Sequence, residues 1–156
     1  MNARALLIET HVHIPPGHAL EQLGAADAER RLPGAGHSIA DIVSHMSFWQ
    51  EWFCRRCAGV ADRLPAPAAR GWPDVTPGSW PDLHARFAAG LERAAALADR
   101  VDQAITPAIE FAPLAGYTVG DALVHIAQHN SYHLGQVVLL RQMMSLWPPP
   151  SGSWTW

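Results

Sequence analysis

The chain has 156 residues, of which 49% are hydrophobic and 16% are charged, and its formal net charge at pH 7 is -3. This size and apolar content predict one globular domain, residues 1–156, and the small negative charge gives no reason to expect binding to nucleic acid or to an anionic membrane. All 11 basic residues are arginine, which excludes a Walker-type phosphate loop and Schiff-base chemistry.

The N-terminal segment and the cysteines bear on the cellular compartment. No stretch approaches the roughly 20 apolar residues of a membrane-spanning helix, and the start of the chain lacks the apolar region of a signal peptide. Only two cysteines are present, Cys54 and Cys57, so there is no disulfide framework to indicate secretion. We expect a cytoplasmic protein.

Helical patterning is weak at the start of the chain and strong from residue 38. Residues 2–13 and 17–30 are expected to form one broken or two short helices, because Pro15 and Pro16 interrupt them. Residues 38–58 begin with a serine followed three places later by an aspartate, which is the pattern of a capping box, and an apolar stripe follows. This segment is predicted to be a long helix.

Two further helices are predicted over residues 80–102 and 118–144. The first has a proline in its first turn and one apolar face, and the second opens with another capping box and is long enough for about 40 Å of helix. The Pro- and Gly-rich linker 59–79 is too long for a simple antiparallel connection and is expected to cross the bundle. Residues 145–156 combine prolines with tryptophans, so this tail is expected to dock on the body or on a partner subunit.

The fold class follows from these elements. Val and Ile are scattered singly, and no alternating run of β-branched residues indicates a strand. The sequence therefore predicts an all-α protein, a four-helix bundle with a long crossover after the second helix and an extended Pro/Trp-rich C-terminal tail.

Histidine is unusually frequent, with nine residues, and it is the commonest metal ligand. His125, His129 and His133 are each four residues apart and form one row on the last helix, but three ligands in that row would have to converge over about 12 Å of axis. A site built on His129 and His133 needs a third ligand from another helix, and His45 is the best candidate because its face should look into the bundle. Spacing alone leaves hydrogen-bonded core histidines as the alternative.

The stretch His125 to Gln136, with the sequence HIAQHNSYHLGQ, and the His-Ser-Ile run that leads towards His45 resemble the DinB/YfiT-like superfamily of small metal-binding four-helix proteins. The resemblance covers nearly the whole chain, including the Trp-Pro-Pro-Pro-Ser-Gly tail. It implies a long crossover, homodimerisation, and a divalent ion held by His45, His129 and His133. The two prolines near residue 15 depart from the family pattern.

A site of three neutral imidazoles leaves the ion its full charge and an open position that would activate water or a thiol. The resemblance implies both chemistries, since members are regarded as metal-dependent hydrolases and relatives use low-molecular-weight thiols such as bacillithiol or mycothiol. We therefore expect a divalent-metal-dependent hydrolase or thiol S-transferase that acts on a small molecule. The alternative is a non-catalytic dimeric metal-binding or stress-response module. Imidazole donors suit Zn, Ni or Fe, and also Cu, so the ligand type leaves the metal open.

Other residues are candidates for further parts of the site. Candidates for groups around the ion are His125, Trp49, Trp52, Tyr132 and Gln136. The Cys54 and Cys57 pair has the spacing of a redox or zinc motif, but it lacks the βαβ context of a thioredoxin-like protein and lies too far along the helix to share an ion with His45. We interpret the cysteines as packing residues. Surface or capping roles are expected for the remaining histidines: His11, His13, His18, His37 and His84.

Overall fold

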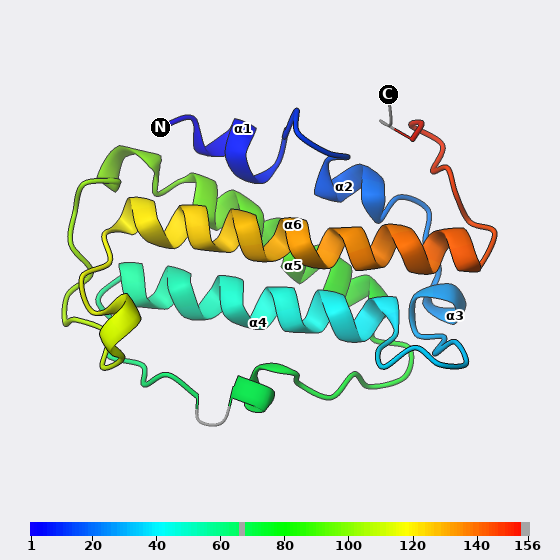
Figure 1. The fold of residues 1–156 in the computed structure, drawn as a ribbon, viewed down its shortest axis with the longest axis horizontal. Helices are drawn as coiled ribbons and strands as arrows, with labels where there is room; N and C mark the ends of the chain where they lie inside the picture. The colour runs from blue at the N-terminus through cyan, green and yellow to red at the C-terminus, as the bar shows by residue number, and fades with distance from the viewer. Residues whose placement is uncertain (66–67, 154–156) are drawn as a thin grey trace.

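A computed structural model describes residues 1–65 and 68–153 of the chain. Three long helices lie side by side and form its body (Figure 1): α4 (Ile39–Cys57), α5 (Trp80–Ala95) and α6 (Val119–Met143). Within the described ranges there is no β-strand, only an isolated bridge between Ala104 and Thr118. The predicted all-α class is confirmed. None of the described helices has the length and hydrophobicity needed to cross a membrane.

The two capping boxes predicted from the sequence are both present. The Ser38 hydroxyl accepts a hydrogen bond from the Asp41 amide at 3.1 Å, and the Asp41 carboxylate accepts one from the Ser38 amide at 2.8 Å. Thr118 and Asp121 make the same reciprocal pair at the start of α6. Each box satisfies amide groups that the first turn of a helix leaves unpaired, so the starts of α4 and α6 are fixed locally.

The N-terminal segment differs from the prediction of one broken or two short helices, because it forms three single-turn helices: α1 (Ala3–Leu7), α2 (Pro16–Ala19) and α3 (Ala25–Ala28). Pro15 is the N-cap of α2 and Pro16 is its first residue, and proline restricts the residue before it to extended backbone, so no helix runs into α2 from the N-terminal side. Side-chain contacts, rather than a continuous helix, hold this N-terminal segment against α6. The His13 Nε2 atom lies 2.7 Å from the Ser131 hydroxyl oxygen, and the Arg141 guanidinium donates to the Ala19 carbonyl at 2.9 Å.

The predicted crossover is confirmed. After α4 the chain runs back along that helix, through the short 3-10 helix η1 (Ala68–Gly71), so that α5 lies parallel to α4 while α6 is antiparallel to both (Figure 1).

The predicted helix 80–102 ends early, at Ala95, and is followed by η2 (Ala98–Arg100). The Val101 carbonyl accepts a hydrogen bond from the Gly120 amide of α6, so this stretch contacts α6 rather than extending α5. A third 3-10 helix, η3 (Ala112–Leu114), precedes α6.

A buried polar contact sets the register of the three long helices. The Gln50 amide nitrogen on α4 donates to the Phe87 carbonyl of α5 at 3.0 Å, and the Asn130 amide nitrogen on α6 donates to the Gln50 amide oxygen at 2.9 Å. A Cβ atom at Gly90 would lie 2.3 Å from the Gln50 amide nitrogen, so the close approach of α5 requires glycine there. Because a buried amide must keep its partners, sliding one helix along another is costly, and the residues around Gln50 are held opposite those around Asn130.

The C-terminal tail docks on the body over its described part. Leu146 and Trp147 pack against the hydrophobic core, and the Ser151 amide donates to the Glu21 carboxylate at 2.9 Å. The tryptophans at 154 and 156, which contributed to the expectation of docking, lie outside the described residues.

Candidate metal centre

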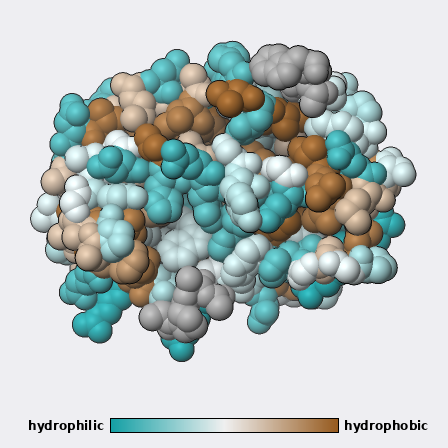
Figure 2. Space-filling model, in the orientation of Figure 1, coloured by the Kyte–Doolittle hydropathy of each residue, from teal (hydrophilic) through white to brown (hydrophobic). Residues whose placement is uncertain are grey.

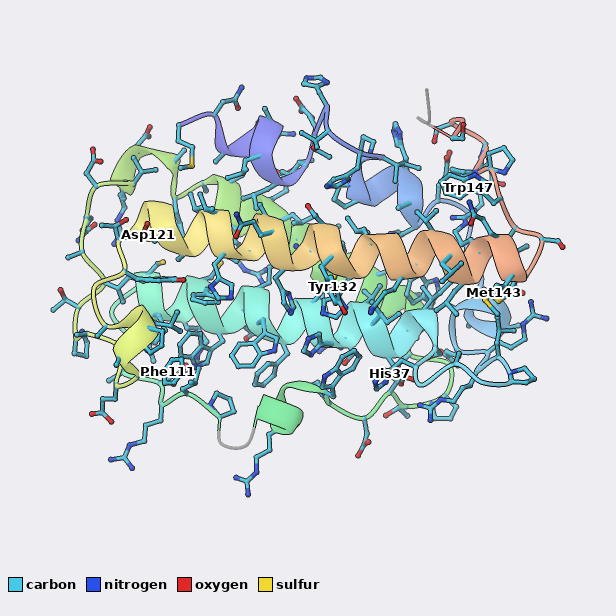
Figure 3. The ribbon with its side chains drawn as sticks, viewed as in Figure 1. His37, Phe111, Asp121, Tyr132, Met143 and Trp147 are labelled. Carbon is cyan, nitrogen blue, oxygen red and sulfur yellow. The ribbon has the colours of Figure 1, made fainter. Side chains whose placement is uncertain are left out.

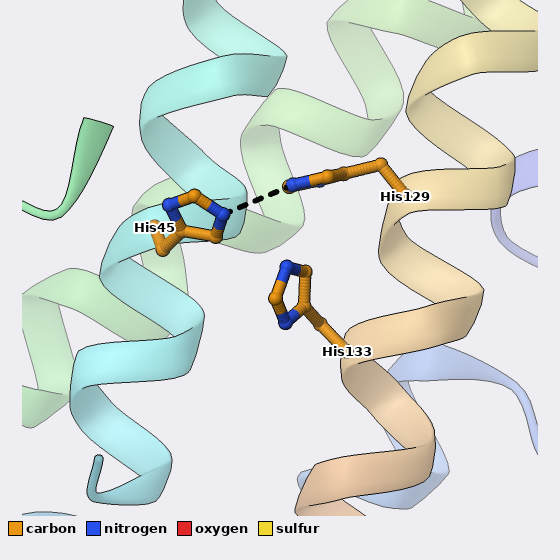
Figure 4. Close-up of side chains that lie close together, drawn as sticks. All are labelled: His45, His129 and His133. Carbon is orange, nitrogen blue, oxygen red and sulfur yellow. Dashed lines mark hydrogen bonds between the residues drawn. The ribbon is translucent and has the colours of Figure 1, made fainter. Parts of the chain in front are cut away.

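Three of the predicted site residues meet between α4 and α6. His45 comes from α4, and His129 and His133 come from successive turns of α6 (Figure 4). One nitrogen from each ring lies within 4.8 Å of the other two, and the Nε2 atoms of His45 and His129 are 3.0 Å apart. His45 and His133 are buried and His129 is half-buried. The register fixed by Gln50 and Asn130 places these rings opposite one another.

Hydrogen bonds define which ring nitrogen of His45 and His133 is free. The Nδ1 atom of His45 lies 2.6 Å from the Gly71 carbonyl oxygen, and the Nδ1 atom of His133 lies 2.8 Å from the Gln136 amide oxygen. A carbonyl oxygen only accepts, so each Nδ1 atom donates and carries the proton. A neutral imidazole protonated at Nδ1 has its lone pair at Nε2, which is the arrangement found in metal-ligating histidines.

All three rings are held in the neutral form. Burial, together with a smaller effect of neighbouring histidines, lowers the pKa of His45 to about 4 and that of His129 to about 3. Burial also lowers the pKa of His133, against the opposing effect of its hydrogen bond to Gln136. Desolvation favours the uncharged form of a histidine, so at pH 7 the three rings are available as donors without first losing a proton.

This donor set fits a divalent ion. Zinc binds histidine nitrogen at about 2.0–2.1 Å, which places tetrahedral donors about 3.3 Å apart. The 3.0 Å separation of His45 from His129 is close to that value, and the 4.8 Å limit on the whole set is compatible with it after modest ring rotations. Among the described residues, the side chains that could together hold a metal ion are these three histidines, and neither a carboxylate nor a thiolate joins them. Imidazole donors alone suit several divalent metals.

The other candidate residues fall into two groups. Three of them contact the ligands. The Trp49 ring packs edge-on against His45 with ring centroids 6.5 Å apart, and the exposed Tyr132 ring packs edge-on against His133 with centroids 5.0 Å apart. Gln136 orients His133 through its hydrogen bond to Nδ1. His125 and Trp52 are turned elsewhere. The Nδ1 atom of His125 is 3.1 Å from the Tyr117 hydroxyl, and the Trp52 indole nitrogen donates to the Arg63 carbonyl at 3.2 Å.

Sequence reasoning missed two residues of the crossover, Gly71 and Trp72. Gly71 accepts the hydrogen bond from His45, and the Trp72 indole stacks on the His45 ring with centroids 3.8 Å apart and planes 9° apart. His37, expected at the surface or at a cap, is exposed but stacks on the other face of Trp72 at 3.8 Å. The Pro-rich linker has no periodicity that would have indicated these contacts.

The two cysteines stand apart from this group. Cys57 is buried in the hydrophobic core and Cys54 packs against it. Burial raises the pKa of the Cys54 thiol to about 11 and also raises that of Cys57. Both therefore stay protonated at neutral pH, whereas a nucleophile or a metal ligand needs the thiolate.

The fold and the site together define a helical-bundle protein with a three-histidine group suited to a metal ion. A family model described as the DinB superfamily matches residues 18–137, which is most of the chain, and the protein belongs to that superfamily. The resemblance drawn from the histidine motif is confirmed. No curated protein and no solved structure is significantly similar to the chain.

Proposed function

We propose that this DinB-superfamily protein is a divalent-metal-dependent enzyme whose ion, Zn, Ni or Fe, is held by His45, His129 and His133. The observation that carries the proposal is the convergence of three neutral imidazoles from two helices, two of them with Nδ1 already engaged by a carbonyl oxygen. A bound divalent ion would supply a Lewis acid with a position left for a small nucleophile.

The surroundings of the ligands favour a thiol over water as that nucleophile. Among the described residues, the ionisable groups that shift the pKa values of the three ligands are other histidines, including His37 and His125, and no carboxylate is among them. Water attack is commonly assisted by a positioned general base, whereas a thiol ionises near neutral pH and needs less assistance. We therefore place thiol S-transfer to a small electrophile first and hydrolysis second.

Metal binding is tested by titrating metal-free protein with Zn²⁺ in competition with a chromophoric chelator. We expect tight binding by the wild type and its loss in His129→Ala. His125→Ala is the matched control, because it removes a histidine one turn away that faces Tyr117, and it should bind as the wild type does. Equal binding by the wild type and His129→Ala would refute the proposed ligand set.

The reaction is tested with two probes on the metal-loaded protein. Consumption of a low-molecular-weight thiol with 1-chloro-2,4-dinitrobenzene, in which the sulfur displaces chloride, reports S-transfer, and p-nitrophenyl acetate reports hydrolysis. Metal-dependent S-transfer that is absent in His129→Ala supports the first assignment. Hydrolysis alone would reassign the protein to the hydrolases, and neither activity with retained metal would favour the non-catalytic module.

We also propose a homodimer formed through the exposed face of α6. Between Asp121 and Arg141 this helix carries no charged residue, and Tyr132, Leu139 and Met143 are 68%, 56% and 57% exposed along one stripe. Hydrophobic surface lies over the same half of the helix in Figure 2, and Figure 3 shows Tyr132 and Met143 on that face. Depletion of charge together with exposed Tyr and Met is typical of the core of a protein interface.

The shape of the exposed face of α6 favours a second copy of this chain as the partner that covers it. A Cβ atom at Gly135, within the stripe, would meet nothing within 4 Å, so a partner helix can approach closely there. We expect a dimer in analytical ultracentrifugation and a 17.0 kDa monomer for Leu139→Glu. The control Phe111→Glu changes an exposed apolar residue at the other end of the molecule (Figure 3) and should leave the dimer intact. A monomeric wild type would contradict the proposal.

A further inference from the structure

We infer that Gly71 and Trp72 of the crossover act as a clasp that positions His45 for metal binding, and that residue 71 must be glycine because Trp49 occupies the space of any side chain there. Neither residue belongs to the ligand set. The inference rests on the proposed metal site, but it concerns contacts of this chain that exist without an ion.

The clasp fixes His45 in two independent ways. The 2.6 Å hydrogen bond to the Gly71 carbonyl selects the tautomer with a proton on Nδ1 and sets the direction of the ring. The stack with Trp72, at 3.8 Å and 9°, sets the plane of the ring. Together they aim the Nε2 lone pair at His129, which is 3.0 Å away (Figure 4).

The clasp is itself held in place by α4. Trp72 lies between His45 and His37, and the second stack has the same 3.8 Å centroid distance with planes 12° apart. His37 immediately precedes Ser38, the N-cap of α4, so the two rings that sandwich Trp72 come from the first two turns of α4 and from the residue just before its cap. In addition, the Ser44 hydroxyl donates to the Pro73 carbonyl at 3.3 Å. The crossover is therefore held against the helix at residues 72 and 73, directly after the carbonyl that orients His45.

Gly71 fits this position because it lacks a side chain. A Cβ atom there would lie 2.6 Å from Nε1, 2.8 Å from Cε2 and 2.9 Å from Cζ2 of the Trp49 indole, closer than real contacts allow. Trp49 has little freedom to move, because its ring packs edge-on against Phe48 and Trp52 as well as His45. An alanine at 71 would therefore displace the backbone, and with it the carbonyl that His45 needs.

Loss of the clasp should weaken metal binding. Removing the partner that orients a ligating histidine typically lowers metal affinity about 10- to 100-fold, because the ring must find the correct tautomer and plane at the moment of binding. We expect a loss of this size for Gly71→Ala. Gly116→Ala is the matched control, since a Cβ atom at that glycine meets nothing within 4 Å.

A double-mutant cycle separates the clasp from general destabilisation. Trp49→Leu removes all three indole atoms that a Cβ at residue 71 would meet, so Gly71→Ala should cost at least about tenfold in Zn²⁺ affinity with Trp49 present and less than about threefold in the Trp49→Leu background. An equal loss in both backgrounds, or no loss in either, would overturn the inference.

A second readout needs no metal. Long-range ¹H–¹⁵N correlation spectra of the metal-free protein report the tautomer of each histidine. His45 should be protonated at Nδ1 in the wild type and should shift towards a mixture of tautomers in Gly71→Ala, while His133, held by Gln136, keeps its own tautomer. If the wild type shows this tautomer but binds no metal, the proposed function is refuted, whereas the claim that Gly71 and Trp72 orient His45 is supported. An unchanged His45 in Gly71→Ala would overturn the clasp whatever the metal result.

Discussion

Replacing Gln136 with methionine tests whether the orientation of His133 contributes to metal binding. Methionine is similar in length and cannot accept the hydrogen bond that His133 donates from Nδ1 at 2.8 Å. A neutral hydrogen bond contributes about 0.5–1.5 kcal/mol, and leaving a buried donor unpaired costs about 1–3 kcal/mol. His133 is only 5% exposed, so water replaces the lost partner poorly. We therefore expect metal binding to weaken by about 1–2 kcal/mol, which is roughly tenfold.

The assay is a Zn²⁺ competition titration on metal-free protein, with thermal unfolding measured in parallel. Gln136→Glu should retain or strengthen binding, because a carboxylate accepts the same hydrogen bond and adds negative charge. Gln142→Met is the matched control, since it makes the same change at an exposed position further along α6. The reasoning is refuted if Gln136→Met binds Zn²⁺ as tightly as the wild type.

Three further predictions concern pH, helix capping and thiol reactivity. The pKa values of His45 (about 4) and His129 (about 3) lie below the unfolded value of about 6.5, so the unfolded chain binds more protons between these limits. The free energy of unfolding of the metal-free protein should therefore fall as the pH is lowered from about 6.5 towards 4, and urea titrations that show no such fall would contradict this. Ser38→Ala removes the N-cap of α4 and should cost about 1 kcal/mol in guanidinium unfolding, whereas no measurable loss would count against the capping box. Cys54, with a thiol pKa of about 11, should react with iodoacetamide at pH 8 at least about a hundredfold more slowly in the folded than in the unfolded protein, and comparable rates would show that folding does not raise this pKa.

The parts of the fold that were predictable from the sequence are those fixed by neighbours in the chain. Ser38 with Asp41 and Thr118 with Asp121 form their capping boxes within one turn, so the starts of α4 and α6 could be placed from the sequence. The end of α5 could not, because the backbone beyond Ala95 is engaged by the start of α6 through the Val101 carbonyl. That contact depends on how the helices pack, and no local pattern encodes it.

The candidate site likewise contains residues that were predictable from the sequence and residues that were not. His129 and His133 are four residues apart on one helix, so their meeting follows from helix geometry. His45 could be proposed because its face looks into the bundle, but its position opposite His129 depends on the buried contact between Gln50 and Asn130. Gly71 lies in a linker without periodicity, and its role appears only once the crossover is folded against α4.

The most direct test of the account is the metal content of the protein purified without an affinity tag or added metal. Elemental analysis of the wild type and of His45→Ala, side by side, should find close to one divalent ion per chain in the first and little in the second. That result would establish that ligands from α4 and α6 hold the ion together. A wild type that contains no metal and takes up neither Zn²⁺ nor Ni²⁺ would contradict the central claim and leave the three histidines as buried residues of the core.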